Sequence, residues 1–588
     1  MLKLTVDQPT NLAKALRGEG LALKMSCGGN GSCKTCRVVL GDDAVLACQT
    51  DVAAGCHEII VSAHALQPDS FQLDMDLVVD LARDGRQPRF QRFEVSVPGP
   101  DDQPGASDVD RIRAALGQPG YSFSAEVTSE ISRAEIAGGM TVSVWDDCVI
   151  DIGSRATATF AVLAIDIGTT TISCALLDAN NGQVLAQAGK ANAQYNYAED
   201  LAARISFCNS RERLAEMRSL LLRDCLIPLT KELLIEAGVP ARDVLTTVVS
   251  GNAPMIHILL GYDPTSMGGY PFNGVDFAPA PKEARKSGLP GKFVEFLPAH
   301  SAYFGGDVVS GLWVEQISHA KETTFFLDLG TNAEMALVHD GTCLVTAAPA
   351  GPAFEGGGLA WGIGGVEGAI DHIWAAGDRL EFSTIGGAPA RGICGSGIIS
   401  FVAAAFRAHG MSKSGRFRER DEIRYIQFGD QRMKAWFLTE EIYVTEEDIS
   451  KFLQAKAAVF SALHSLCRQA GLQPGDLRQV YIAGNFGRYL KIEDVIEIGL
   501  LPDIDPSRVT LCGNTSLAGA AATAFDQSAA SAQEDLIGNL QFIDLNGLPT
   551  FQDDFIDALF IPHRSKDLFP SVADAKKVRR RRSRSRAA

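Results

Sequence analysis

The chain has 588 residues, of which 46% are hydrophobic and 21% charged, and 71 acidic against 54 basic residues give a formal net charge of −17. This length predicts several domains, and the acidic body argues against a nucleic-acid-binding core. No apolar run approaches the length of a membrane span and the N-terminus lacks the pattern of a secretion signal, so we expect no membrane association and a cytoplasmic location.

Residues 1–66 carry the pattern of a small domain built from short strands around one helix. Apolar alternation predicts strands at 2–5, 37–40 and 58–63, and a helical period covers 11–17. Between the helix and the second strand, the stretch CGGNGSCKTC places three thiols within ten residues, separated by glycines. Such a stretch cannot form a helix face or a plain strand, so we predict a loop wrapped around a metal centre.

The cysteine spacing is typical of an iron–sulfur cluster. Three cysteines follow the pattern C-x5-C-x2-C and a fourth lies a short way on, which suits a 2Fe–2S cluster because each iron needs two protein sulfurs. The predicted ligands are Cys27, Cys33, Cys36 and Cys48. Zinc is the alternative, although zinc sites usually show two separate C-x2-C pairs, and Cys56 is a second candidate for the fourth ligand. These features predict a β-grasp-like ferredoxin domain.

Two further stretches separate this domain from the rest of the chain. Residues 67–91 are polar and acidic with a helical apolar period, which indicates a linker. Residues 92–160 are predicted to form a small middle α/β domain, with strands at 93–97 and within 141–152 and a helix at 107–117. Nothing in this middle domain has the spacing of a catalytic site.

The large remainder contains an internal repeat. In the first copy the strand VLAID ends at Asp166, and a G-T-T-T turn leads into a second strand. An N-N-G turn then connects this strand to a third one that runs in the opposite direction. In the second copy the strand FFLDL contains Asp328, and a G-T-N turn leads into a second strand. A D-G turn then connects this strand to a third one that runs in the opposite direction. Both copies read as strand, Asp-x-Gly-Thr turn, strand and tight hairpin. We therefore predict two lobes with the same strand order, facing each other across a cleft.

The two Asp-x-Gly-Thr turns have the composition of a phosphate site. Glycine lets the backbone fold tightly, exposed N–H groups and threonine hydroxyls can hold phosphate oxygens, and the aspartate can hold magnesium through water. Two copies on matched scaffolds predict nucleotide binding, with a pair of purely structural hairpins as the alternative. The candidate nucleotide-binding residues are Gly168, Thr169, Thr170 and Thr171 in the first turn and Gly330, Thr331 and Asn332 in the second.

Further motifs complete a pattern that resembles a known family. AIDIGTTT and LDLGTNAE occur together with AGPAFEG (350–356), GICGSG (392–397), AKAA (455–458), AGNFG (483–487) and GNTSLAGA (513–520). The set resembles the ATPase domain of reductive activators of corrinoid-dependent enzymes, which belongs to the superfamily of actin, sugar kinases and heat-shock chaperones. The resemblance also covers the N-terminal cysteine loop, the linker and the middle domain, and it leaves out the basic C-terminal tail.

The resemblance implies a multidomain α+β and α/β protein with a two-lobed actin-like ATPase domain over residues 161–565. Asp166 and Asp328 would act in catalysis by holding Mg²⁺ and the ATP phosphates, and Asp307 and Glu334 are the candidates for orienting the attacking water. Asp307 reads equally well as an acid favoured near a helix N-terminus by the helix dipole. The adenosine-side turn, which otherwise reads as an ordinary strand-to-helix connection, would consist of Gly484, Asn485 and Gly487.

Two other charged features have competing interpretations. Asp200 and Arg204 lie four residues apart on a predicted helix and read as a surface ion pair, or, by the resemblance, as a contact between lobes or with a partner. Residues 566–588 contain the run KKVRRRRSRSR (576–586) and are predicted to form a basic, disordered tail.

The resemblance implies an ATP-hydrolysing iron–sulfur oxidoreductase that passes one electron from its cluster to the Co(II) corrinoid of a methyltransferase-system corrinoid protein, restoring Co(I). The implied cofactors are a 2Fe–2S cluster, ATP and Mg²⁺. The implied partners are the corrinoid protein and a low-potential electron donor, with homodimer formation as a further expectation. Three other functions fit parts of the sequence: an ATP-driven donor to another metalloenzyme, a small-molecule kinase with a redox-sensing ferredoxin domain, and a non-enzymatic adaptor.

Overall fold

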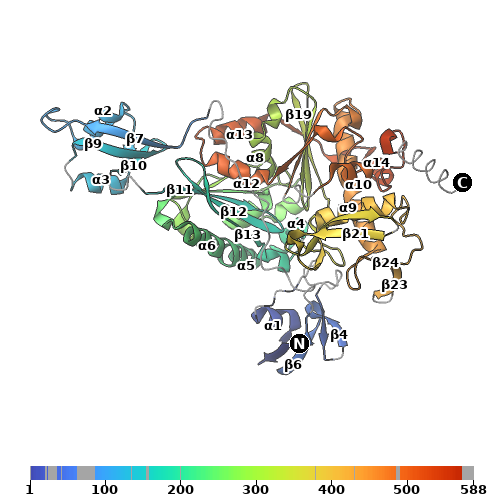
Figure 1. Cartoon of the computed structure of the whole chain (residues 1–588). Helices are drawn as coiled ribbons and strands as arrows, with labels where there is room; N and C mark the ends of the chain where they lie inside the picture. Colours follow the sequence, from blue (N-terminus) through green and yellow to red (C-terminus); the bar gives the residue numbers. More distant parts are fainter. Residues whose placement is uncertain are drawn as a thin grey trace.

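The computed structural model has two small bodies and one large one along the chain (Figure 1). The residues it describes are 2–19, 21, 23, 36–41, 43–61, 86–133, 136–153, 158–198, 200–377, 379–428, 431–484 and 490–572. The predicted linker helix within 67–91 therefore lies almost wholly outside the described residues. Among the described residues, we find no helix with both the length and the apolar character needed to cross a membrane.

The first small body has a four-stranded sheet in the order β1-β6-β3-β4. Its strands are β1 (Leu2–Val6), β3 (Arg37–Leu40), β4 (Asp43–Leu46) and β6 (Gly55–Ile60), with a short β2–β5 pair (Thr10–Asn11 and Asp51–Val52) beside them. The helix α1 (Leu12–Gly18) buries Leu12 and Leu16 against Leu4 and Ile59. The predicted strands and helix are confirmed, although the closing strand begins at Gly55 rather than at residue 58.

The second small body has a four-stranded sheet in the order β7-β9-β10-β8 with two helices. Its elements are β7 (Phe90–Val97), α2 (Asp108–Leu116), β8 (Ser122–Phe123), α3 (Ala125–Ile131), β9 (Gly138–Trp145) and β10 (Cys148–Ile152). The helix predicted at 107–117 is confirmed, because Ser107 caps its start and Gly117 ends it in the left-handed conformation. The first strand begins at Phe90, two residues before the predicted start of this domain.

The large body contains two six-stranded sheets, ordered β13-β12-β11-β14-β16-β15 and β27-β26-β17-β18-β19-β28. The first comprises β11 (Ala161–Ile167), β12 (Thr171–Asp178), β13 (Val184–Ala191), β14 (Val244–Gly251), β15 (Lys282–Glu283) and β16 (Phe293–Phe296). The second comprises β17 (Thr324–Leu329), β18 (Ala333–His339), β19 (Thr342–Ala348), β26 (Gln479–Ala483), β27 (Val509–Gly513) and β28 (Leu540–Phe542).

The predicted repeat is confirmed by the pairing of these strands. In each sheet the first three strands form an antiparallel meander, and the first strand also pairs in parallel with a later strand, β14 in one lobe and β26 in the other. A further parallel strand, β16 or β27, follows in each lobe. The D-G turn between β18 and β19 has positive φ at Asp340 (47°) and Gly341 (75°), as a tight hairpin requires.

Helices cover both sheets of the large body (Figure 1). Those of the first half are α4 (Leu201–Phe207), α5 (Arg211–Ser219), a π-helical turn (Leu220–Leu226), α6 (Ile227–Ala237), α7 (Ala253–Leu260) and α8 (Gly306–Val314). Those of the second half are α9 (Gly395–Arg407), α10 (Glu446–Gln469), α11 (Ile492–Glu497), α12 (Thr515–Thr523), α13 (Ala529–Gly538) and α14 (Phe551–Ala558).

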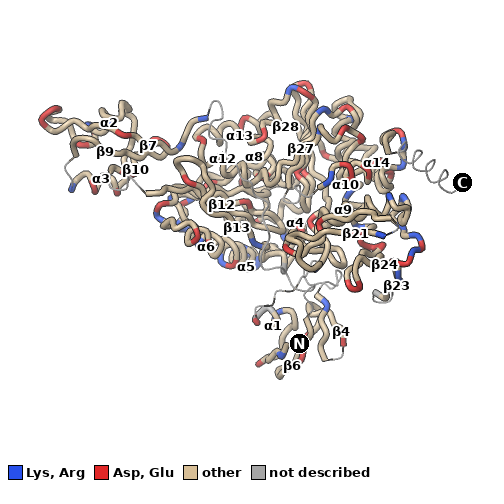
Figure 2. The backbone as a smooth tube through the Cα atoms, in the orientation of Figure 1, with Lys and Arg blue, Asp and Glu red and all other residues tan. Residues whose placement is uncertain are grey.

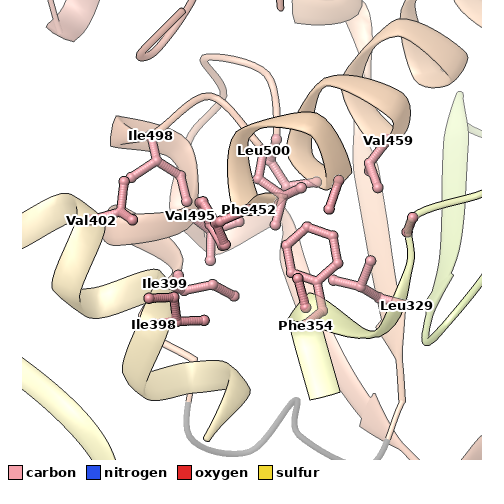
Figure 3. Close-up of a cluster of buried hydrophobic side chains, with 14 of the residues drawn as sticks. Leu329, Phe354, Ile398, Ile399, Val402, Phe452, Val459, Val495, Ile498 and Leu500 are labelled. Carbon is pink, nitrogen blue, oxygen red and sulfur yellow. The ribbon is translucent and has the colours of Figure 1, made fainter. Parts of the chain in front are cut away.

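Two small sheets and a large core complete the second lobe. The sheets comprise β20 (Ala369–Ala376), β21 (Arg379–Thr384) and β22 (Gly392–Ile393), and β23 (Ile423–Phe428), β24 (Gln431–Phe437) and β25 (Tyr443–Thr445). Figure 3 shows part of the core, in which Phe354 packs against Phe452 of α10 with ring centroids 5.6 Å apart, and to which α9 contributes Ile398 and α10 also contributes Val459. Phe354 immediately precedes a residue of the functional site, so this packing fixes part of that site. Charged residues of both signs are interspersed along the outer segments of the chain (Figure 2, in the orientation of Figure 1).

The packed chain continues beyond the predicted boundary at residue 565. Phe569 and Val572 are buried in a cluster with Phe460 of α10, and Phe569 is 1% exposed. The buried ammonium of Lys456 donates to the carbonyl oxygen of Phe560 at 2.8 Å, which ties the segment after α14 to α10. The prediction that the tail starts at residue 566 is therefore wrong, because buried apolar side chains keep the chain packed against α10 as far as Val572.

Candidate functional site

Each of the two Asp-x-Gly-Thr turns is closed by a hydrogen bond from the N–H of its glycine, and the first turn is one residue longer than the second. In the first turn the N–H of Gly168 donates to the carbonyl of Thr171 at 3.0 Å, and in the second the N–H of Gly330 donates to the carbonyl of Asn332 at 2.9 Å. A Cβ atom at residue 168 would lie 2.6 Å from the Thr171 carbonyl oxygen, so this turn requires glycine. Local hydrogen bonds thus give both turns the compact form that their sequences predicted.

A glutamate links the two turns. Glu355, in a short 3-10 helix (Pro352–Glu355), accepts hydrogen bonds from the hydroxyl of Thr170 at 2.8 Å and from the hydroxyl of Thr331 at 2.5 Å. Both bonds end on the same carboxylate oxygen, and the two hydroxyl oxygens lie 3.4 Å apart. Because the threonines belong to different lobes, the carboxylate joins the lobes at the place where phosphate oxygens were predicted to bind.

Asp166 is held by side chains that lie about 350 residues away in sequence. Its carboxylate oxygens accept from the hydroxyl of Ser516 at 2.7 Å and from the amide of Asn514 at 2.9 Å. The Ser516 hydroxyl also lies 2.8 Å from that of Ser250, which stands beside Asp166 in the parallel pair of β11 and β14. Burial raises the pKa of Asp166, and the two hydrogen bonds oppose that rise.

Three more carboxyl groups meet near the second turn. Glu334 stands directly opposite Asp328 in the antiparallel pair of β17 and β18, which places both side chains on one face of the sheet. Asp307 comes from the first turn of α8, where its carboxylate accepts from the N–H of Val308 at 2.9 Å. Burial, with the negative charges nearby, raises the pKa of Asp307 to about 7 and that of Asp328 to about 8. The same causes raise the pKa of Glu334 well above its ordinary value.

These acids line one cavity of about 100 Å³. Asp166, Asp307, Asp328, Glu334 and Glu355 all contribute to it, and no lysine, arginine or histidine occurs among its described lining residues. No three of the described histidine, cysteine or acidic side chains converge closely enough to hold a metal ion directly. Burial and mutual repulsion disfavour the ionised form of these carboxyl groups, so they are stable as carboxylates together only when a cation lies beside them. A hydrated Mg²⁺ fits this donor set, because Mg²⁺ keeps several waters and binds through one or two carboxylates.

The interpretation of Asp200 and Arg204 as a surface ion pair is wrong. Asp200 caps α4 and accepts from the N–H of Ala203 at 2.7 Å, whereas Arg204 is fully buried. The guanidinium of Arg204 donates to the carbonyl of Ala198 at 3.1 Å and also to the carbonyl of Thr169. Arg204 therefore supports the backbone of the first turn from inside the first lobe.

Two residues at strand ends complete the described part of the site. Asn252 follows β14 and caps α7, and its amide donates to the Thr169 hydroxyl at 3.2 Å. Gly484 follows β26 and lines the cavity with φ at 123°, in the range that favours glycine. The other two residues predicted for this turn, Asn485 and Gly487, lie outside the described residues.

The N-terminal domain brings two of the predicted cluster ligands together. Cys36 is buried and Cys48 packs against the same small core. The N–H of Ala47, the residue before Cys48, donates to the carbonyl of Cys36 at 3.0 Å, so the two cysteines lie on adjacent backbone. Cys56 instead lies exposed in β6, opposite Thr5. The remaining predicted ligands, Cys27 and Cys33, lie outside the described residues.

Several residues of the site were not assigned from the sequence. Glu355, Asn514 and Ser516 lie inside the motifs AGPAFEG and GNTSLAGA, which supported the resemblance without any role for these side chains. Asn252 stands between a buried strand and a helix, a position where asparagine reads as an ordinary cap. Arg204 was interpreted as solvent-exposed because it follows Asp200 by four residues, the spacing of an ion pair on a helix surface. The motifs themselves were the available signal for the first three.

The matched sheets, the paired turns and the acidic cavity define the class of two-lobed actin-like ATPases. Comparison with protein families identifies three regions, described as a 2Fe–2S iron–sulfur cluster binding domain (residues 2–53), the RACo middle region (161–320) and the C-terminal domain of RACo, the ASKHA domain (322–573). An N-terminal iron–sulfur domain and an ATPase domain therefore occur on one chain.

Known proteins that are similar to this chain are named as activators or reductases of corrinoid proteins. The solved structure of a reductive activator for corrinoid, iron–sulfur protein superimposes with a TM-score of 0.76 and 30% identity, covering 96% of this chain and 97% of that one. The corrinoid activation enzyme RamQ of Eubacterium limosum is 28% identical over 545 residues, which are 88% of this chain and 90% of RamQ. A [Co(II) methylated amine-specific corrinoid protein] reductase of Methanosarcina barkeri is 27% identical over 243 residues, covering 38% of this chain and 42% of that protein. The chain belongs to the family of reductive activators of corrinoid proteins.

Proposed function

We propose that this protein is an ATP-dependent reductive activator that transfers one electron from its N-terminal 2Fe–2S cluster to the Co(II) corrinoid of a methyltransferase-system corrinoid protein. In this reaction the reduced cluster loses one electron, Co(II) becomes Co(I), and ATP and water become ADP and phosphate. The observation that carries the proposal is the acidic cavity, where the paired turns of an ATPase meet on a chain that also has an iron–sulfur domain. Its relatives are named for this reaction.

The turns would bind the triphosphate through backbone and hydroxyl donors. The exposed N–H groups of the turns and the hydroxyls of Thr169, Thr170 and Thr331 offer hydrogen bonds to phosphate oxygens. Asp166 and Asp328 would hold a hydrated Mg²⁺, since their carboxylates line the cavity from opposite lobes. Once bound, Mg²⁺ would supply charge neutralisation for the phosphates. Gly484 lets the backbone of the adenosine-side turn come close to the ribose and base.

Asp307 is the group that we propose as the general base. Its carboxyl lies in the cavity with a pKa raised to about 7, close to the pH at which a base and its conjugate acid are both available. The N–H of Val308 holds one carboxylate oxygen at 2.9 Å and thereby orients the group. Asp307 could therefore accept a proton from the water that attacks the terminal phosphate. Glu334, opposite Asp328, would adjust the charge around the magnesium.

ATP hydrolysis would offset the cost of an uphill electron transfer. Plant-type 2Fe–2S clusters have potentials near about −400 mV, and each ~100 mV of a one-electron gap costs about 2.3 kcal/mol. Nucleotide binding can change this equilibrium only through different affinities of two protein states for the partner. We therefore expect the open and closed arrangements of the lobes to bind the Co(II) form of the corrinoid protein with different affinities.

For the N-terminal domain we propose Cys27, Cys33, Cys36 and Cys48 as the cluster ligands. The shared core of Cys36 and Cys48 supports Cys48 over the exposed Cys56. Electrons would reach the cluster from a low-potential donor.

The test combines the purified holoprotein with a low-potential reductant, Mg²⁺ and a corrinoid protein, and follows the Co(I) absorbance with and without ATP. We expect Co(I) to accumulate with ATP, and we expect D307N to lose ATP hydrolysis while still binding ATP. D505N, at an exposed cap before the start of β27 and outside the cavity lining, serves as the matched control. Equal Co(I) formation without ATP would contradict the proposal.

A further inference from the structure

The helix α12 has one end in the nucleotide site and the other at the segment that leads in from the N-terminal domain. At its start, Asn514 and Ser516 hold the carboxylate of Asp166. Its end is followed directly by Phe525 and Asp526, which contact residues 86–89. Nine residues of helix, about 14 Å at 1.5 Å per residue, separate the two contacts.

The segment 86–89 is fastened to the end of α12 by several hydrogen bonds. The guanidinium of Arg86 donates to the carbonyl of Phe525 at 3.0 and 3.2 Å, and its centre lies 5.3 Å from the Phe525 ring. The N–H of Gln87 donates to the carboxylate of Asp526 at 3.2 Å, and the N–H of Gln527 donates to the carbonyl of Gln87 at 2.8 Å. Pro88 and Asp526 form an antiparallel bridge. A short strand-like contact thus joins two parts of the chain about 440 residues apart.

Arg89 fixes the same segment to two other elements. Its guanidinium pairs with Asp146, in the turn between β9 and β10, at 2.9 Å and with Glu295 of β16 at 2.9 Å. It also lies 4.5 Å from the ring of Trp145. The segment that leads into the second small body is therefore held at a defined point on the ATPase domain, and the end of α12 is part of that point.

The packing of α12 favours movement as a rigid unit. A Cβ atom at Gly519 would lie 2.4 Å from the Cβ of Ser310 in α8, and one at Gly311 would lie 2.7 Å from the Thr515 hydroxyl. Glycines therefore let the two helices approach closely, and α8 carries Asp307 into the same cavity. Protein interiors packed this tightly transmit displacement instead of absorbing it.

We propose that α12 couples the nucleotide site to the N-terminal domain, with Arg86 and Asp526 as positioning residues for electron transfer. When Asp166 engages magnesium and phosphate, its hydrogen bonds with Asn514 and Ser516 change, and α12 shifts residues 86–89 at its other end. The shift displaces the point at which the chain that connects to the N-terminal domain is anchored on the ATPase domain, and this displacement controls electron transfer to the partner. This inference rests on the proposed function, because it assigns the route by which ATP controls the electron transfer.

The first test compares hydrogen–deuterium exchange of the wild-type holoprotein with and without Mg²⁺ and a non-hydrolysable ATP analogue. We expect exchange in peptides covering residues 86–92 and 524–527 to change at least fivefold on nucleotide binding. Unchanged exchange in both peptides, in a protein that demonstrably binds the analogue, would overturn the inference. This measurement needs no corrinoid protein, so it remains informative if the proposed function fails.

The second test uses R86A, which removes both guanidinium hydrogen bonds to the carbonyl of Phe525, leaves the one from the Arg89 N–H, and lies outside the nucleotide site. We expect its ATP hydrolysis rate and iron content to match the wild type while the amount of Co(I) formed per ATP falls at least fivefold. R113A is the matched control, because Arg113 bonds Asp110 and Tyr121 within the second small body and does not contact α12. An R86A protein with unchanged Co(I) per ATP, or with Co(I) and hydrolysis lowered equally, would refute the positioning role.

Discussion

The contact between Glu355 and the two phosphate turns predicts a specific effect of removing its charge. Glu355 accepts hydrogen bonds from Thr170 at 2.8 Å and Thr331 at 2.5 Å, and the cavity beside it measures about 100 Å³. Ligand sites for molecules of drug size usually measure about 300–1,000 Å³. ATP therefore has to break both hydrogen bonds and widen the cavity before its phosphates can take the place of the carboxylate.

The expected size of the effect follows from the two hydrogen bonds. A bond to a charged acceptor contributes about 1.5–3 kcal/mol and a neutral one about 0.5–1.5 kcal/mol. Replacing the carboxylate by an amide, E355Q, should weaken the pair by about 2 kcal/mol in total. Because every 1.4 kcal/mol is a factor of ten, ATP should bind up to about 30-fold more tightly. Removal of a negative charge beside the phosphates acts in the same direction.

The assay is a titration of the nucleotide-free holoprotein with ATP and Mg²⁺, followed by calorimetry at constant pH. E381Q is the matched control, because Glu381 lies exposed in β21 and does not line the cavity. Tighter binding by E355Q alone would support the view that Glu355 occupies the phosphate position in the absence of nucleotide. Binding that is unchanged or weaker would refute this reasoning and would indicate that Glu355 helps to hold the bound magnesium or phosphate.

Two further predictions concern the cluster and the buried acids. C48S should lose most bound iron and the visible absorbance of the cluster, whereas C56S should keep both; the reverse result would assign the fourth ligand to Cys56. Because burial raises the pKa of Asp328 from 3.8 to about 8, its folded form holds a proton that the unfolded form loses, and the stability of the nucleotide-free protein should fall as the pH rises from about 4 to 8. D328N should therefore raise the melting temperature by a few degrees at pH 8 and by less at pH 5, and an equal or larger gain at pH 5 would contradict this assignment.

Local features of the chain could be predicted because their causes are local. The two Asp-x-Gly-Thr turns, the hairpins at Gly182 and Gly341, and the alternating strands beside them follow from turn chemistry and side-chain period within about 30 residues. The helix at 107–117 follows in the same way from a serine cap and a terminal glycine. The end of the ATPase domain could not be predicted in this way, because the burial of Phe569 depends on its contact with Phe460 of α10, about 100 residues earlier in the chain.

The sequence by itself determined the class of chemistry: two phosphate turns with aspartates, and a cysteine loop suited to a cluster. Only the tertiary structure decided which other side chains share the cavity, because Glu355, Asn514 and Ser516 come from positions 185 to 350 residues away from their partners in the first turn. It also decided that Arg204 is a buried support rather than a surface charge. The physical reason is that hydrogen bonding and desolvation depend on distance in space, and the parallel pairing of strands that are distant in sequence sets that distance.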